Sequence, residues 1–371
     1  MTSHLGRMVG ALGILCTTGP FAIAEQSPIE NTLREPDLSH HEAEVGIREG
    51  SFVVVPIPSH SEQLGYALAV AVGYLFQMDE GSRGSNIGLG YFRSDNGSTG
   101  YGAMANLAWG NDAWSLLALA GTVDLNYDFY VAGLPVPLNQ SGDLAMLKLK
   151  HSVGNHWYLG GMLQYLESDI ALDTGGLIPP EILPSVGLEL ATVGLLAEYD
   201  TRDNSYYPTR GLHANISLTY GSEIHDLIPD HQKALAKLDG YWPVGSKGVV
   251  AARLTGCAAS QNTPFFNLCG IGSSDGMRGF ASMRFTDRQL MSAQIEYRQR
   301  IGDSRFGFVA FAGAGAAAQQ LTSVDQEDIH AAAGIGLRFR LSKKFPLDYS
   351  ADVAFNDEGE QTLHLYVGQS F

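Results

Sequence analysis

Apolar and polar residues alternate along most of this chain, in segments that end at runs of glycine, proline, asparagine or aspartate. Residues 210–222 show the pattern clearly, because Leu212 and Ile216 fall on one side of an extended chain while His213 and Asn215 fall on the other. Successive side chains of a β-strand point to opposite faces, so a period of two indicates strands with one apolar and one polar face.

The pattern predicts sixteen strands, at 51–59, 64–76, 85–93, 99–109, 113–125, 142–152, 156–169, 187–200, 210–222, 232–242, 248–258, 286–300, 306–320, 329–341, 346–356 and 362–371. Strands of about 9 to 11 residues, tilted by about 45°, cross the hydrocarbon core of a membrane. Glu296, Arg298 and Arg300 fall on one polar face, and the core of a soluble protein does not hold so many charges. We therefore predict an all-β fold, a 16-stranded antiparallel transmembrane β-barrel with lipid outside and a polar lumen.

The predicted connections differ in length between the two ends of this barrel. An even number of strands places both chain ends on the periplasmic side, so connections alternate between periplasmic and external. The periplasmic ones are mostly short, whereas the external ones include 126–141, 170–186 and, as the sixth, 259–285. Aromatic girdles lie at membrane interfaces. The four tryptophans all flank predicted periplasmic turns: Trp109, Trp114, Trp157 and Trp242.

The first residues have the features of a cleavable signal peptide, with Arg7 before an apolar run at 8–15 and a small-residue cleavage site. We expect residues 1–24 to be removed on export. Residues 25–50 are acidic and polar, which predicts a flexible periplasmic tail, and 51–371 form the barrel. An exported barrel of this kind belongs in the outer membrane of a Gram-negative bacterium.

The formal net charge of −16 excludes a nucleic-acid partner, because no basic surface is available to displace phosphate counterions. Serine and histidine residues are common, but no spacing places them in a catalytic arrangement, so we expect no enzymatic activity and no catalytic residues. The chain likewise offers no cofactor motif and no cluster of metal ligands.

Two cysteines, Cys257 and Cys269, remain after signal cleavage and are 12 residues apart. The oxidising environment outside the inner membrane favours a disulfide that closes one loop. Two free thiols are the alternative.

Two motifs indicate a family. The segment from Tyr199 to Gly211 carries Asp200, Arg202, Asp203, Pro208 and Gly211, in the order D-x-R-D followed by P-x-x-G. It resembles a periplasmic turn of the BamA/TamA-like superfamily of outer-membrane assembly factors, also called bacterial surface antigen proteins. Aspartate and arginine side chains can hydrogen-bond the turn backbone, and proline and glycine can fix its dihedral angles.

The second motif, Arg278-Gly279-Phe280, resembles the tip of that family's sixth external loop. The resemblance implies that this loop folds into the lumen and that Arg278 pairs with carboxylates, one of which matches Glu296. The family's second carboxylate is an aspartate in an F-x-D-x-G pattern, and we read Ala312, after Phe311, as its replacement here. This departure weakens the predicted latch.

The chain ends in alternating apolar residues and a terminal Phe371, which resembles the C-terminal signal that the barrel assembly machinery reads. We therefore expect that machinery and outer-membrane lipids as partners.

Two functions are compatible with these features. The first is assistance in protein or lipid insertion or translocation at the outer membrane, with an unidentified secreted protein or lipid as substrate. Its working edge would be the seam between the first strand, which contains Pro56 and Pro58, and the last strand, because prolines weaken strand pairing. The second is a passive pore or structural surface antigen without transport activity. The predicted 26-residue tail is shorter than the POTRA modules that precede assembly-factor barrels.

Overall fold

A computed structural model describes residues 46–371 of the chain, apart from 62–64, 132–133, 173–184, 205, 226, 281–283 and 342–345. The predicted signal peptide, 1–24, lies outside the described residues, as does the tail up to residue 45. The described helical segments are single 3₁₀ turns, and none of them is long or apolar enough to cross a membrane.

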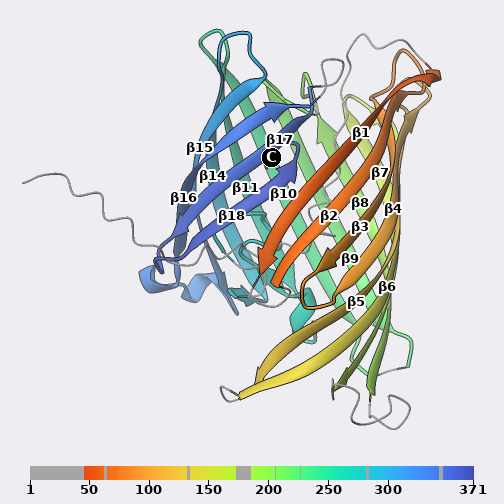
Figure 1. Ribbon diagram of the computed structural model, residues 1–371, viewed down its shortest axis with the longest axis vertical. Coiled ribbons are helices and arrows are strands. Elements are labelled where there is room, and N and C mark those ends of the chain that lie inside the picture. Colours follow the sequence, from red (N-terminus) through yellow and green to blue (C-terminus); the bar gives the residue numbers. More distant parts are fainter. Residues whose placement is uncertain are drawn as a thin grey trace, which may run out of the picture.

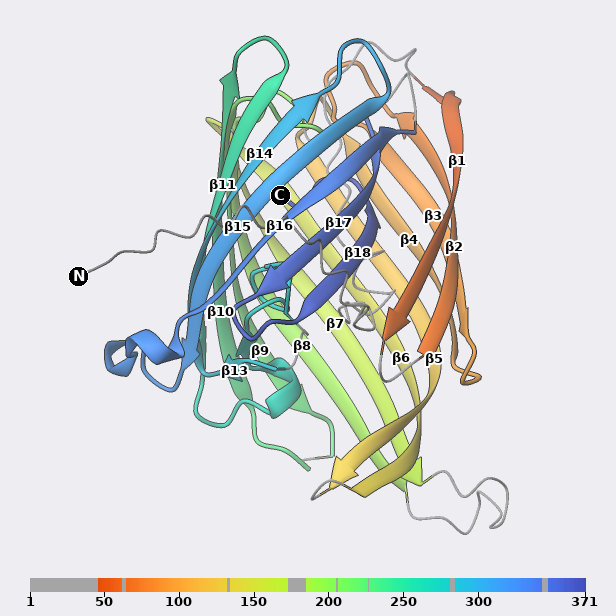
Figure 2. The ribbon, with the colours of Figure 1, turned by 60° about the vertical axis from the view of Figure 1, so that its left-hand side comes forward.

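Sixteen antiparallel strands form one sheet in chain order, and the sheet curves into a nearly closed barrel (Figures 1 and 2). They are β1 (Gly46–Ser61), β2 (Gly65–Gln77), β3 (Ser85–Ser94), β4 (Thr99–Trp109), β5 (Trp114–Val131), β6 (Leu134–Gly154), β7 (Trp157–Leu172), β8 (Ser185–Asp200), β9 (Gly211–Glu223), β10 (His231–Val244), β11 (Gly248–Ala259), β14 (Gln289–Arg300), β15 (Phe306–Ala318), β16 (His330–Arg340), β17 (Asp348–Asn356) and β18 (Gln361–Val367). The short strands β12 (Cys269–Gly270) and β13 (Thr286–Asp287) pair separately within the loop between β11 and β14. The predicted fold class and strand count are confirmed.

The predicted alternation of faces is also confirmed. In β9, Leu212, Ile216 and Leu218 are exposed, and in β14 the exposed Ile295 alternates with the buried Glu296. Exposed large apolar side chains recur on the outer faces of strands around the barrel. A soluble monomer does not present so extensive an apolar surface, whereas a membrane barrel requires one.

The predicted boundaries differ most from the structure in two places. Residues 46–50, assigned to the tail, belong to β1. Residues 126–141, predicted as an external loop, are mostly strand, because β5 and β6 stay paired up to Val131 and Leu134. The resulting hairpin, drawn in yellow in Figure 2, extends beyond β4, whose pairing with β5 ends at Asp124, while β7 follows it as far as Leu172. Two prolines in its second strand, Pro135 and Pro137, had indicated a loop.

The inner wall has two chemically different halves. From β9 to β17 the inward side chains include Asp239, Arg253, Glu296, Arg338 and Asp352, all of which have little exposed area. From β1 to β6 the inward positions are mostly glycine, alanine or larger apolar residues. Ion pairs therefore organise one half of the lumen, and the other half is apolar.

The sheet has two edges, β1 and β18, which meet at a seam (Figure 1). Both strands are described along their whole length, and no backbone ladder joins them. β1 has 16 residues and β18 only seven, so most of β1 has no strand opposite it at the seam. Side chains hold the edges together instead, because Val55 and Ile57 of β1 share an apolar cluster with Leu365 and Val367.

Candidate functional site

The loop between β11 and β14 is tied to the inner wall at its start. Cys257, on the inward face of β11, forms a disulfide with Cys269 of β12. Both cysteines pack with Ile271, Met277 and Phe280 in one buried apolar cluster. The predicted disulfide is therefore present, and the apolar residues of the loop form a small core of their own.

The loop tip is shaped by a side chain and a glycine. The Asp275 carboxylate accepts hydrogen bonds from the backbone N–H groups of Gly272 and Met277, at 2.7 and 2.9 Å. Gly279 has φ near 107°, and a Cβ there would lie 2.8 Å from the Cβ of Ala332. Only glycine fits this position, because other residues avoid positive φ and would also clash.

Arg278 is buried, with 2% of its area exposed, and it contacts four strands of the barrel, the fourth through the Tyr366 hydroxyl of β18 at 3.4 Å. Its Nη2 donates to Glu296 Oε2 of β14 at 2.5 Å, and its Nη1 donates to the carboxylate of Asp352 on β17. The guanidinium carbon lies 3.5 Å from the ring centroid of Phe311 on β15. Burial lowers the pKa of the Arg278 guanidinium, but the two carboxylates outweigh burial, so its pKa is raised and the group stays charged.

The two carboxylates also pair with cations of the wall. Arg298 donates to Glu296 at 2.7 Å, and Arg338 forms a forked pair with Asp352. We call Arg278, Glu296, Arg298, Arg338 and Asp352 the ionic cluster. Such a cluster is stable away from water only because nearly every charge has an opposite charge within hydrogen-bonding distance.

The structure corrects the role assigned to Ala312. Ala312 is exposed on the outer face of β15 and cannot reach the lumen. The inward position two residues after Phe311 is Gly313, and a Cβ there would lie 2.7 Å from the sulfur of Met277. Glycine at 313 thus makes room for the loop tip, while Asp352 of β17 supplies the second carboxylate.

The aspartate and arginine side chains of the predicted turn motif, 200–211, form hydrogen bonds within the turn. The carboxylate of Asp200 receives two guanidinium bonds from Arg202, at 2.9 and 2.7 Å. Asp203 accepts from the backbone N–H groups of Thr209 and Arg210. Pro208 is buried. Gly211 has φ near 108°, and a Cβ there would lie 2.3 Å from a backbone carbonyl oxygen.

This turn also reaches across the barrel, which its sequence did not indicate. Tyr206 packs with Leu75 of β2 and with Leu347, which precedes β17. β8 and β9 flank the turn in the middle of the strand order, whereas β2 and β17 lie next to the seam. Side chains of the turn therefore contact the wall on the opposite side of the barrel.

Phe371, the proposed C-terminal assembly signal, does not continue the last strand. β18 ends at Val367, and Gly368 has φ near 101°. Phe371 is buried in a cluster with Tyr241, Val249 and Ala251 of β10 and β11, and its carbonyl oxygen accepts from Arg298. The last residues therefore turn inward, and in the folded barrel the Phe371 ring does not face lipid.

A further charged group lies at the end of the barrel where β8 ends. Glu198, Asp200 and His213 are close enough to one another to hold a metal ion. However, Glu198 is already paired with Lys150 and Arg83, and Asp200 with Arg202. These cations neutralise the carboxylates, so we assign the group to an ion-pair network of the inner wall.

With this geometry in view, comparison with protein families gives one match, in which residues 188–371 fit the model of the Omp85 superfamily domain. The chain carries an Omp85 superfamily domain. The Omp85 match spans β9 to β18 and most of β8, and it includes both the turn motif and the ionic cluster. The predicted resemblance to BamA/TamA-like barrels is thus confirmed. A search of curated protein sequences found no match.

Solved structures agree with the Omp85 assignment at the level of fold. BamA from Haemophilus ducreyi lacking POTRA domains 1–3 is 17% identical, with a TM-score of 0.54, over 86% of this chain and 69% of that one. CdiB from Escherichia coli is 14% identical with a TM-score of 0.59, over 85% and 61%. CdiB from Acinetobacter baumannii is 10% identical with a TM-score of 0.56, over 85% and 58%. The chain thus spans about three fifths of the length of either CdiB.

A first prediction concerns the disulfide of the Omp85 domain. The Cys257→Ser/Cys269→Ser variant should be cut faster by protease between residues 260 and 288, because closing a loop of this size contributes about 3 kcal/mol to its ordering. The heat resistance of the barrel should change little, since the bond lies at the end of β11. Time-resolved proteolysis followed by mass spectrometry measures both fragments and intact barrel. Equal nicking of parent and variant would show that the apolar cluster orders the loop unaided.

Proposed function

We propose that this Omp85 barrel assists the insertion or translocation of a protein or lipid at the bacterial outer membrane, using the β1–β18 seam as its working edge. The observation that supports this proposal is the missing backbone ladder between β1 and β18. An unpaired strand edge is a template for another strand, and inside a bilayer its unpaired N–H and C=O groups favour such pairing strongly.

The side-chain contacts that close the seam should need little energy to separate. Val55, Ile57, Leu365 and Val367 join the edges through apolar contacts, which lipid chains can replace. Pro56 of β1 lies among these residues and lacks a backbone N–H, so it cannot donate to a ladder. A substrate strand would therefore add its own hydrogen bonds to an edge that forms few with β18.

The proposal is tested by locking the seam. Cysteines at Val55 and Leu365, which belong to one cluster across the seam, should form a disulfide when oxidised. A matched control places cysteines at Val55 and Ala71, which are already paired between β1 and β2. Proteoliposomes of each variant are given a urea-unfolded small β-barrel protein and, separately, a fluorescent phospholipid whose transfer across the bilayer is recorded.

We expect oxidation of the Val55→Cys/Leu365→Cys variant to reduce folding of the substrate, or transfer of the lipid, to the rate of empty liposomes. Reductant should restore the rate, and the Val55→Cys/Ala71→Cys control should stay active in both states. Parent protein given the same reductant controls for loss of the native disulfide. Full activity of the locked protein would refute the proposal.

Partners follow from the same proposal. The barrel assembly machinery would insert this chain, outer-membrane lipids would surround it, and its substrate would be a secreted or membrane-inserted protein or a lipid. The family match supports this class of function.

One observation favours the alternative, a structural barrel without transport. The ionic cluster and the turn motif both place side chains inside the lumen, where they obstruct a continuous water channel. A barrel that is closed in this way and active in neither assay would be a surface antigen rather than a transporter.

A further inference from the structure

The inner wall of β2–β5 carries a band of residues without side chains or with very small ones. Ala71, Gly90, Gly102 and Gly121 are direct neighbours across successive strands, and the band ends at Leu144 of β6. Because inward glycines leave the backbone bare, this part of the wall is hollowed toward the lumen. We call the band and the residues beside it the glycine trough.

The trough is not filled by the described parts of the chain. A Cβ placed on Gly73 would have one atom within 4 Å, the backbone carbonyl oxygen of Ile87 at 3.8 Å. A Cβ on its cross-strand partner Gly88 would approach only backbone atoms of the same wall, the nearest at 3.4 Å. Among the described residues, no side chain lies within 4 Å of either of these positions.

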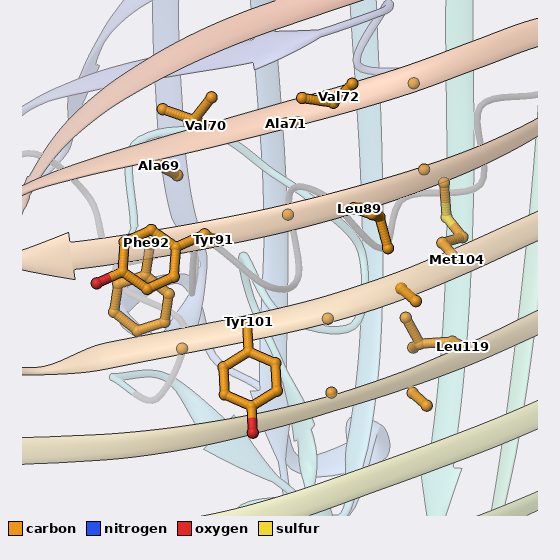
Figure 3. A pocket seen from close by; sticks show the side chains of 18 of the residues that line it. Ala69, Val70, Ala71, Val72, Leu89, Tyr91, Phe92, Tyr101, Met104 and Leu119 are labelled. Atoms are coloured by element: carbon orange, nitrogen blue, oxygen red, sulfur yellow. The ribbon is translucent and has the colours of Figure 1, made fainter.

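Larger apolar residues form the two long sides of the trough. Phe92 and Val123 lie along one side, where the Phe92 ring covers Gly100, and Met104 and Leu119 lie along the other. Figure 3 shows Ala69, Phe92, Met104 and Leu119 on successive strands of this wall. They form part of the lining of a half-open cavity of about 310 Å³. Ligand sites in proteins have volumes of roughly 300 to 1,000 Å³.

Both ends of the cavity contain a side-chain amide. At one end it is closed by the apolar cluster of Leu75, Tyr206 and Leu347, with the buried amide of Asn86 beside Leu75. At the other it reaches Gln140 and Ser168, whose side chains are hydrogen-bonded to each other at 2.8 Å. Because the wall between the two ends is apolar, a ligand that fits is apolar along most of its length and has its polar group at a terminus.

The cavity also borders the seam. Val53, Val55 and Ile57 of β1 and Val367 of β18 line it, and these strands share no backbone ladder. When the apolar contacts of the seam open, as the proposed function requires, a molecule dissolved in the bilayer can enter from the side without crossing the ionic half of the lumen.

We infer that the glycine trough binds a fatty-acyl chain of a membrane lipid. Apolar wall facing lumen water is unfavourable, and an acyl chain would remove it from water without needing hydrogen bonds. The narrow glycine floor admits an unbranched chain more readily than a ring. The glycine band lies on β2–β6, before residue 188, whereas Tyr206, Leu347 and Val367, which complete the cavity, fall within the Omp85 match.

Photolabelling tests the site in the full chain. The protein in nanodiscs of phosphatidylethanolamine and phosphatidylglycerol is mixed with palmitic acid carrying a diazirine near its methyl end, irradiated, digested and mapped by mass spectrometry. Label is expected on inward residues such as Met104 and Leu119. Outward residues of the same strands, such as Ala103, report ordinary contact with the bilayer.

Gly88→Leu fills the trough at a position where a side chain meets little strain, and Gly73→Leu is a second variant of the same kind. Either should lose most of the inward label and keep the outward label. Ala103→Leu adds similar bulk to the lipid-facing side and should keep both. The folded band on semi-native gels verifies that each variant forms a barrel.

A second arm replaces the fatty acid by a phosphatidylethanolamine with the diazirine on one acyl chain. Inward label from the phospholipid assigns the site to membrane lipid, whereas inward label from palmitic acid alone would overturn that source. Label confined to outward residues, or inward label that survives Gly88→Leu and Gly73→Leu, would overturn the site itself. These results do not depend on transport, so they can be separated from those of the locked seam.

Discussion

Asp352→Ala should be the most damaging single substitution in the ionic cluster. The carboxylate of Asp352 is fully buried and accepts from Arg278, Arg338 and the hydroxyl of Tyr366. Its loss leaves two buried guanidinium groups with Glu296 as their nearest carboxylate. Removing one partner of a buried ion pair lowers the free energy of unfolding by about 3 to 5 kcal/mol. The folded band should therefore be lost at a clearly lower temperature on semi-native gels, with faster proteolysis between residues 260 and 288.

Asp352→Asn keeps a hydrogen-bonding side chain of the same shape and should have a milder effect. Val353→Ala, on the outward-facing neighbour, serves as the control for loss of side-chain volume in β17. If Asp352→Ala melts and is cut like the control, water or a lumen ion replaces the carboxylate without loss, and the ionic cluster does not hold the loop.

Arg278→Ala should release the loop while the barrel itself remains folded. Glu296 keeps Arg298 and Asp352 keeps Arg338, so each carboxylate retains a cation. Truncating one partner of a buried charged pair costs about 2 to 5 kcal/mol of stabilising free energy. We expect the loss for Arg278→Ala to lie toward the lower end of that range. Arg278→Lys should recover only part of it, because a lysine cannot donate to both carboxylates in the same forked way.

Comparing Arg278→Ala, Asp352→Ala and the double variant in the same melting and proteolysis assays measures the coupling between the two residues. Because they are in direct contact, the double variant should be less damaged than the sum of the two single variants. Glu296→Gln should resemble a mild form of Arg278→Ala. Simple additivity of the two single substitutions would contradict the pairing seen in the structure.

The strands of this barrel are predictable because local alternation is imposed by the lipid outside and the lumen inside. Prediction fails where a residue's role depends on distant partners. The inward position of Asp352 follows from the pattern of β17, but its contact with Arg278, 74 residues away, does not. Tyr206 likewise gave no local signal that it would cross the lumen to Leu75.

The prediction for Ala312 is wrong by one position, because the next lumen-facing residue of β15 after Phe311 is Gly313. In a strand such a shift moves a side chain from the lumen to the lipid face. The β5–β6 hairpin differs from the prediction for another reason: Pro135 and Pro137 lack backbone donors, which predicts an end of pairing, yet β5 and β6 stay paired there. Strand pairing beyond the rim of the barrel tolerates them.

The sequence separations within the ionic cluster bear on the order in which the protein folds. Arg278 precedes Glu296 by 18 residues and Asp352 by 74, so its second carboxylate belongs to the penultimate strand. Contacts between distant residues form late, because closing a long loop costs chain entropy. Until β17 is in place, Arg278 keeps its hydration more readily than it enters an incomplete cluster. Seating of the loop tip therefore reports that the last strands have arrived, and a chain stalled before β17 should leave its sixth loop open to solvent.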